Sequence, residues 1–292
     1  MLQKMERMHG VRIWYAFLLL TVIFLLLSGC GKVQGKQKNI MQENRQNAAQ
    51  PLDVWFFACS EDADSILLKT GDVDILIDTG IEEDGKDFLE KLETLGVDDI
   101  ELLILTHPDK DHIGGAPMLL ETFQVERLIQ TSCVKGSELQ EEMNQKLEDN
   151  PGMEQVEVLQ KKETVEFGEL KLTVYPPKET EYKNSNNYSI GVLAEFEGKS
   201  FFFAGDAKKK RMEELLEEKL PDVDVYKAAH HGRDNGASVE LIMRLKPEYA
   251  VITAEKPEEE TKLALEALGA DIYCTYEKDI HFFVKDGVLD VR

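Results

Sequence analysis

The residues best suited to chemistry lie in one short polar segment. Four side chains that can bind a metal ion fall within six positions: His107, Asp109, Asp111 and His112. They follow directly on residues 101–106, which are apolar enough for a strand buried on both faces. Imidazoles and carboxylates together suit divalent ions such as Zn, Mn or Fe. The simpler interpretation is a solvated Asp-rich turn with two incidental histidines.

Two later segments place similar residues after strand-like runs. Phe201–Ala204 is followed by Gly205-Asp206, and residues 223–228 are followed by the pair His230-His231. Taken singly, Asp206 is more often a turn residue, and His230 is more often a structural histidine. Four of the six histidines of the chain nevertheless fall in these strand-end motifs. Such clustering predicts a metal centre.

Strands and helices alternate through the part of the chain that must position these residues. Period-2 and apolar runs predict strands at 52–57, 65–70, 73–78, 101–106, 127–130, 156–175, 190–196, 200–204, 223–228, 250–253 and 281–284. Helical spacing predicts helices at 86–95, 117–123, 138–148, 208–219, 238–245 and 258–268. No internal linker divides them. We expect one α/β domain over residues 52–292.

The motif set resembles the metallo-β-lactamase superfamily, whose first motif is His-x-His-x-Asp-His with later Asp and His ligands. The variant Thr-His-Pro-Asp-Lys-Asp-His-Ile-Gly-Gly at 106–115 is similar to the hydrolase domain of ComEC-like competence proteins, where aspartate replaces the second histidine. Ile77-Asp78-Thr79-Gly80 and residues 186–189 resemble two further segments of that group. The resemblance implies a single-domain αββα four-layer sandwich.

The resemblance also implies roles for the site residues. His107 and Asp109 would bind one divalent ion, and Asp111 and His112 the second. Asp206 would bridge both ions. His231 would be the last ligand, with His230 as the alternative, and Asp78 would either orient a ligand histidine or be an ordinary turn residue.

The chain departs from the superfamily pattern in one ligand. No histidine occurs in residues 170–200, where most members place a third ligand to the first metal. The expected cofactors are therefore two divalent ions, Zn or Mn.

These roles predict a hydrolase that uses a metal-bound hydroxide. Asp111 would orient the nucleophile, and His230, as the member of the pair that is not a ligand, would donate a proton to the leaving group. Lys110, Lys227 and Arg233 would make the site locally positive, which favours a phosphodiester substrate: a small molecule, a wall component or, in a nuclease version, DNA. A lactone or β-lactam hydrolase of the same fold and a non-catalytic metal- or ligand-binding lipoprotein are the alternatives.

The N-terminal residues predict export and lipid anchoring. Basic residues precede the apolar run 13–27, which matches a signal peptide over residues 1–29 and is short for a membrane span. Leu27-Ser28-Gly29-Cys30 resembles the lipobox of bacterial lipoproteins. We therefore expect a lipidated Cys30, a flexible tether over residues 30–51 and a location on the extracytoplasmic face of the cell membrane. No obligate protein partner is evident from the sequence.

The net charge of the chain argues against one class of function, broad electrostatic binding of DNA. Of 34 Lys and Arg and 56 Asp and Glu, 7 and 2 lie in residues 1–51, so residues 52–292 carry 27 against 54, a net charge of −27. A body this acidic repels long polyanions, which argues against broad electrostatic DNA binding. A phosphodiester could still bind where two metal ions reverse the local field.

Overall fold

The computed structural model describes residues 50–292 of the chain. The expected signal peptide, Cys30 and nearly all of the expected tether lie outside the described residues. Within residues 50–292, no helix is long and apolar enough to cross a bilayer.

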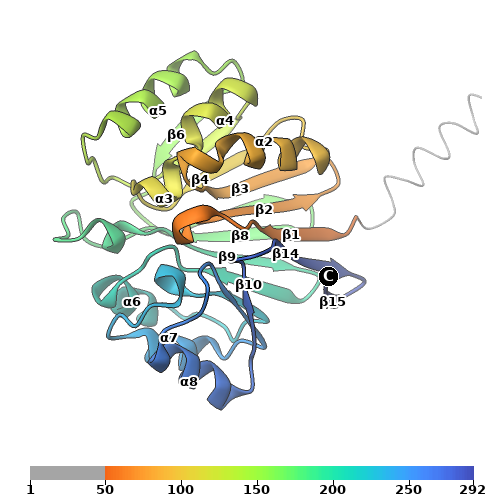
Figure 1. Cartoon of the computed structure of the whole chain (residues 1–292), viewed down its shortest axis with the longest axis vertical. Helices are drawn as coiled ribbons and strands as arrows, with labels where there is room; N and C mark the ends of the chain where they lie inside the picture. The colour runs from red at the N-terminus through yellow and green to blue at the C-terminus, as the bar shows by residue number, and fades with distance from the viewer. Residues whose placement is uncertain (1–49) are drawn as a thin grey trace, which may run out of the picture. The chain divides into compact units, whose positions relative to one another are not determined.

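Two sheets form the centre of the described part (Figure 1). The first has the order β15-β14-β1-β2-β3-β4-β5-β6 and the second the order β13-β12-β11-β10-β9-β8-β7. The strands of the first sheet are β1 (Leu52–Phe56), β2 (Ser65–Thr70), β3 (Val73–Thr79), β4 (Leu102–Leu105), β5 (Arg127–Gln130), β6 (Gln155–Val158), β14 (Ile280–Lys285) and β15 (Val288–Val291). Those of the second are β7 (Glu163–Phe167), β8 (Leu170–Tyr175), β9 (Gly191–Phe196), β10 (Lys199–Phe203), β11 (Val225–Lys227), β12 (Tyr249–Ile252) and β13 (Asp271–Cys274).

Helices cover the outer face of each sheet (Figure 1). The first sheet packs against α2 (Gly85–Thr94), α3 (Lys110–Ile113), α4 (Ala116–Thr122) and α5 (Glu138–Asp149). The second packs against α6 (Lys209–Leu216), α7 (Ser238–Leu245) and α8 (Glu259–Leu268). A third apolar cluster lies between the sheets and draws side chains from both of them. The predicted four-layer αββα sandwich is therefore confirmed.

Parallel pairing explains where the site can form. Strands β3 to β6 are mutually parallel, as are β10 to β13. The loops that follow parallel strands emerge at one edge of each sheet, and this edge is where open α/β folds place ligands. The loops after β4, β10 and β11 carry the three motifs.

The predicted elements match the structure with a few local differences. The helix expected over 208–219 ends at Leu216, and the strand-like region 156–175 divides into β6, β7 and β8. The strands β13 and β15 were not predicted. Both are edge strands with few buried side chains, so their apolar pattern is weak.

Candidate metal centre

The first motif begins in the turn after β4 and continues into α3, which contains Asp111 and His112. His107 and His112 are fully buried, whereas the side chains of Asp109 and Asp111 keep 21% and 26% of their exposure. Gly114, directly after α3, permits close packing there, because a Cβ would lie 2.4 Å from the carbonyl oxygen of Lys110 and 2.5 Å from the backbone nitrogen of Glu82. The glycine therefore allows the backbone contacts that hold the motif against the β3 turn.

The second half of the site comes from the other sheet. Asp206 lies just beyond β10, and His230 and His231 lie in the short turn η4 (Ala229–Gly232) after β11. Both histidines have left-handed backbones, with φ of +50° and +58°. Residues other than glycine, asparagine and aspartate rarely adopt this backbone conformation, which costs about 1–2 kcal/mol per residue. This backbone conformation directs the two imidazoles toward Asp206.

Asp206 lies at the centre of the cluster, with its two carboxylate oxygens facing different groups. Its Oδ1 is 3.2 Å from His112 Nε2 and 3.2 Å from His231 Nε2. Its Oδ2 is 3.8 Å from His107 Nε2 and 3.7 Å from His230 Nε2. A carboxylate placed in this way can serve two metal positions.

Two aspartates of the first motif complete the two groups. Asp111 Oδ2 lies 3.9 Å from His112 Nε2 and 3.6 Å from His231 Nε2, and ligand atoms of Asp111, His112, Asp206 and His231 all lie within 4.8 Å of one another. Asp109 Oδ2 lies 3.9 Å from His107 Nε2. The six predicted ligands and His230 are thus gathered in one place.

The two histidines of the first motif are held so that their Nε2 atoms face the cluster. Asp78 Oδ2 accepts hydrogen bonds from Thr106 Oγ1 (2.6 Å) and His112 Nδ1 (2.7 Å). Because the Thr106 hydroxyl proton points to Asp78, its oxygen is free to accept from His107 Nδ1 at 3.2 Å. With metal ions bound, both rings would keep their proton on Nδ1 and present the Nε2 lone pair to the cluster.

The histidines of η4 are fixed in the same way. The Nδ1 of His231 faces Thr253 Oγ1 at 3.0 Å, and the Nδ1 of His230 faces Asn235 Oδ1 at 3.0 Å. The Asn235 amide nitrogen donates to the carbonyl of Arg233, which leaves its oxygen to accept from His230. All four rings therefore present Nε2 inward.

Several buried atoms of the cluster make no hydrogen bond. They are Nε2 of His107, His112 and His231, and Oδ1 of Asp206. Buried polar atoms without partners are rare and costly in folded proteins. Their convergence on one space fits a metal site, since ligated ions would satisfy all of them.

The electrostatics of the cluster point the same way. Burial by itself lowers the pKa of His231, but the carboxylates of Asp206 and Asp64 outweigh it and raise the pKa to about 10. Burial lowers the pKa of His107, which faces weaker opposing charge, to about 3. Burial would raise the pKa of Asp206, but His112 and His231 hold it well below the usual range. The carboxylates draw positive charge into the cluster, as a cation-binding site must.

The region in which a third histidine ligand is absent contains the turn η3 (Ser185–Tyr188). Asn186 Nδ2 donates to Asp206 Oδ2 at 3.0 Å, and Ser185 Oγ donates to Asp109 Oδ2 at 3.1 Å. Lys135 Nζ lies 2.9 Å from the other oxygen of Asp109. Polar side chains therefore contact both carboxylates on the His107 side of the cluster, where a further histidine ligand is absent.

One expectation is wrong. Lys227 was expected to make the site locally positive, but its side chain is fully buried and forms an ion pair with buried Asp64. Asp64 in turn lies 3.3 Å from His231 Nδ1 and 3.8 Å from His112 Nδ1. Burial would raise the pKa of Asp64, but Lys227 and the histidines hold it below its usual value. The pair lies behind the ligand histidines and faces no substrate.

Arg233 and Lys110 do lie at the exposed side of the site. Arg233 Nη1 lies 3.2 Å from His230 Nε2, and Lys110 Nζ forms an exposed ion pair with Glu61. Asp64 and Thr253 were missed from the sequence. Asp64 lies one residue before β2, and its only sequence signal is an acidic residue at the start of an apolar run.

Comparisons with known proteins identify the family of the chain. The profile described as the Metallo-beta-lactamase superfamily matches residues 61–254. ComE operon protein 3 of Bacillus subtilis is 31% identical over 169 residues, which are 56% of this chain and 21% of that protein. Recombination protein 2 of Haemophilus influenzae is 26% identical over 195 residues, which are 65% of this chain and 22% of that protein. The chain thus spans about a fifth of the length of these curated relatives.

Solved structures share the fold at low sequence identity. The metallo-beta-lactamase fold protein YhfI from Bacillus subtilis has a TM-score of 0.55 and 13% identity, over 83% of this chain and 100% of YhfI. A mutant of the CmlA beta-hydroxylase has a TM-score of 0.52 and 12% identity, over 80% of this chain and 54% of CmlA. With four imidazoles converging on a central aspartate, the chain belongs to the metallo-beta-lactamase superfamily.

Proposed function

We propose that this chain is an extracytoplasmic, membrane-anchored phosphodiesterase that depends on two divalent metal ions. Proteins of the superfamily are generally metal-dependent hydrolases. The observation that carries the proposal is the set of buried Nε2 atoms without hydrogen bonds around an Asp206 carboxylate whose two oxygens face different groups.

The proposed ligands form two groups. His107, Asp109 and Asp206 Oδ2 would hold one ion, and Asp111, His112, His231 and Asp206 Oδ1 would hold the other. Mixed nitrogen and oxygen donors suit Zn or Mn. Such ions, when bound, acidify water and stabilise charge that develops on a substrate oxygen.

Asp111 is the proposed orienting group for the attacking water. It has the most exposed carboxylate of the predicted ligands, at 26%, and it lies between the interior histidines and solvent. Burial would raise the pKa of Asp111, but the nearby His231 imidazole and the charge of His112 hold it at about 2. The group is therefore an ionised acceptor at neutral pH.

His230 is the proposed proton carrier, and its surroundings specify how it would act. Burial lowers its pKa, and its Nε2 accepts from Arg233 while Nδ1 donates to Asn235. His230 is thus neutral at rest and would take up a proton at Nε2 before passing it to a leaving group. Its place 3.7 Å from Asp206 Oδ2 also makes it a possible ligand on the His107 side.

The two roles of His230 give different results for His230→Gln. If His230 is a ligand, the variant binds one metal equivalent fewer, as measured by elemental analysis of the purified protein. If His230 is a proton carrier, both metals remain, and activity falls most for substrates with poor leaving groups.

Phosphodiesters are favoured over β-lactams by the charges at the exposed side of the site. Arg233 and Lys110 lie next to the ligand residues and can contact a phosphate. The names of the two relatives, a ComE operon protein and a recombination protein, support a nuclease version of the proposal. The net charge of −27 over residues 52–292 favours small substrates over long nucleic acid.

Anchoring through a lipidated Cys30 completes the proposal and has a separate test. Cys30→Ser should abolish incorporation of labelled fatty acid and move the protein out of the membrane fraction. Retention of label in the variant would refute the lipoprotein assignment without touching the enzymatic one.

Hydrolysis of bis-p-nitrophenyl phosphate tests the activity, with Mn, Zn or chelator added. We expect metal-dependent turnover and a loss of about 10²–10³-fold in kcat for Asp111→Ala. Asp222→Ala, an exposed aspartate paired with Arg244 and Lys246, is the matched control and should keep the wild-type rate. A metal-loaded protein without turnover would leave the binding-lipoprotein alternative, and turnover of nitrocefin alone would favour the β-lactam alternative.

A further inference from the structure

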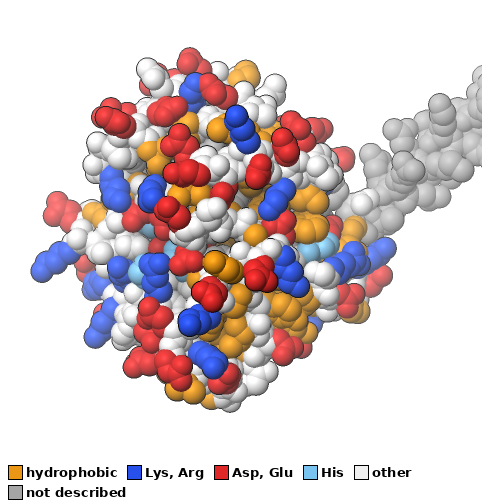
Figure 2. Space-filling model, in the orientation of Figure 1, with side chains coloured by type: hydrophobic (Ala, Val, Ile, Leu, Met, Phe, Trp, Pro, Cys, Tyr) orange, Lys and Arg blue, Asp and Glu red, His pale blue; other side chains and the backbone are white. Residues whose placement is uncertain are grey.

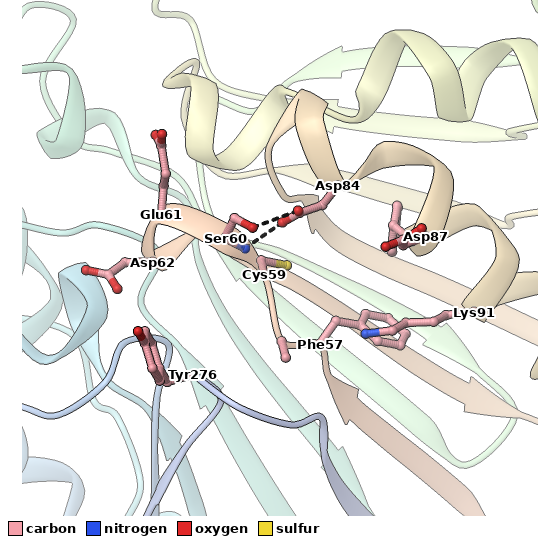
Figure 3. A pocket seen from close by; sticks show the side chains of 11 residues that line it. Phe57, Cys59, Ser60, Glu61, Asp62, Asp84, Asp87, Lys91 and Tyr276 are labelled. Carbon is pink, nitrogen blue, oxygen red and sulfur yellow. Dashed lines mark hydrogen bonds between the residues drawn. The ribbon is translucent and has the colours of Figure 1, made fainter.

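A cavity of about 610 Å³ lies beside the turn η1 (Ser60–Asp62) and belongs to none of the three motifs. Figure 3 shows Phe57 and Lys91 at one side, Tyr276 and Asp62 at another, and Asp84 hydrogen-bonded to Ser60 above them. Figure 2 shows acidic and hydrophobic side chains side by side on the face drawn there. The cavity therefore combines aromatic surface with carboxylates.

One wall of the cavity already binds an ammonium group. Lys91 Nζ lies 5.6 Å from the centre of the Phe57 ring and 2.7 Å from Asp279 Oδ1. The same carboxylate oxygen accepts a hydrogen bond from the backbone of Ala58 at 2.7 Å, which fixes its position. A ring face together with a carboxylate is the usual environment for ammonium ions in proteins.

The rest of the cavity repeats this chemistry with groups that the protein does not use itself. The side chain of Asp87 is exposed and forms no hydrogen bond or ion pair within the described residues. Tyr276 is 60% exposed and presents its ring to the cavity. The lining carries Glu61, Asp62, Asp84 and Asp87 against Lys91. Lys110 and Arg233 pair with Glu61 and Asp62 from outside the lining, so one net negative charge remains. The cavity favours a cation and opposes an anion.

A single guanidinium links this cavity to the metal-ligand cluster. Arg233 Nη2 lies 3.4 Å from Asp62 Oδ2, and Arg233 Nη1 lies 3.2 Å from His230 Nε2. His230 Nε2 is itself 3.7 Å from Asp206. In addition, the backbone nitrogen of Asp64, next to the turn, donates to the carbonyl of Asp111 at 2.9 Å. The cavity therefore borders the exposed side of the cluster, with the Arg233 guanidinium between them.

We propose that this cavity binds the ammonium end of a zwitterionic phosphodiester whose phosphate lies at the metal-ligand cluster. The proposal rests on the phosphodiesterase function and specifies its substrate class. This class is phosphodiesters with a primary or quaternary ammonium group a few bonds from phosphorus. A polynucleotide carries a second phosphate where such a substrate carries its cation. That phosphate would meet the carboxylate of Asp87, so nucleic acid should be a poor substrate.

The test compares two substrates that differ only in the cation. They are p-nitrophenyl phosphorylcholine and its neutral isostere, p-nitrophenyl 3,3-dimethylbutyl phosphate, each assayed with the full chain in mild detergent and added Mn or Zn. We expect kcat/KM to favour the choline ester at least tenfold. The variant Asp87→Asn/Tyr276→Ala should reduce this ratio about fivefold to twentyfold. Glu83→Gln, an exposed acidic residue outside the lining, is the matched control and should preserve it.

Each outcome decides one level of the proposal. Equal rates for the two esters would overturn the cation site and leave the phosphodiesterase intact. If neither ester is hydrolysed, the phosphodiesterase fails, and calorimetric titration with choline against 3,3-dimethylbutanol then decides the cavity alone. Choline binding that weakens in Asp87→Asn/Tyr276→Ala would support the cavity, and absence of choline binding would overturn it.

Discussion

Replacing Lys227 by methionine should destabilise the protein strongly, because it leaves a charged Asp64 buried without its cation. The Lys227 side chain is 0% exposed and that of Asp64 is 1% exposed, so water cannot take over the role of the ammonium. Removing one partner of a buried ion pair typically costs about 3–5 kcal/mol. Two imidazoles also approach Asp64, at 3.3 and 3.8 Å. They offset part of the charge, and we therefore expect a loss near the lower end, about 3 kcal/mol.

The double variant Lys227→Met/Asp64→Asn separates lost charge balance from lost packing. Methionine keeps most of the apolar stem of lysine, and asparagine removes the uncompensated charge. We expect the double variant to be more stable than either single variant.

Thermal and urea unfolding in the presence of chelator, followed by circular dichroism, measure these changes. A loss of about 3 kcal/mol lowers Tm by roughly 6–12 °C in a domain of this size. A Lys227→Met variant within about 1 kcal/mol of wild type, or a double variant less stable than both single ones, would refute the reasoning.

Three further predictions concern the ligands and their support. Thr253→Val removes the hydroxyl 3.0 Å from His231 Nδ1 and should weaken metal binding about tenfold in competition with a chelating dye; unchanged affinity would contradict the orienting role. Although burial lowers the pKa of His231, nearby carboxylates raise it to about 10. A raised pKa stabilises the fold below the unfolded value of about 6.5, and this stability is lost as pH rises through the folded value. The chelated protein should therefore lose Tm between pH 7 and 10, and a flat profile would count against this. Gly114→Ala should cost more than about 3 kcal/mol in urea unfolding, since its Cβ would meet backbone atoms, whereas Gly85→Ala, which meets the flexible side chain of Met118, should cost less than about 1 kcal/mol.

The sequence was sufficient to predict the parts of the site that follow strands. Apolar runs identify β4, β10 and β11, and residues after parallel strands gather at one sheet edge whatever the details of packing. His107 and Asp206 could therefore be assigned together, although 99 positions separate them in the printed sequence.

The groups behind the ligands depend on contacts between the sheets, which no local pattern encodes. Asp64 precedes a strand of the first sheet and Lys227 lies in the second, so the two meet only when the sandwich closes. The burial of Lys227 could have been inferred from alternation, since it lies on the same side of β11 as Val225, which packs between the sheets. Nothing in the sequence indicates that Asp64 is its partner.

The left-handed backbone at His230 and His231 has a consequence for laboratory evolution of this protein. Glycine at either position would relieve the backbone strain of about 1–2 kcal/mol and remove an imidazole that faces Asp206. A library selected for heat resistance alone should therefore enrich glycine at position 230 rather than 231, because His231 also offsets the charge of buried Asp64, and the enriched clones should be inactive. Screens for a more stable variant should therefore leave His230 and His231 unchanged and vary other parts of the fold.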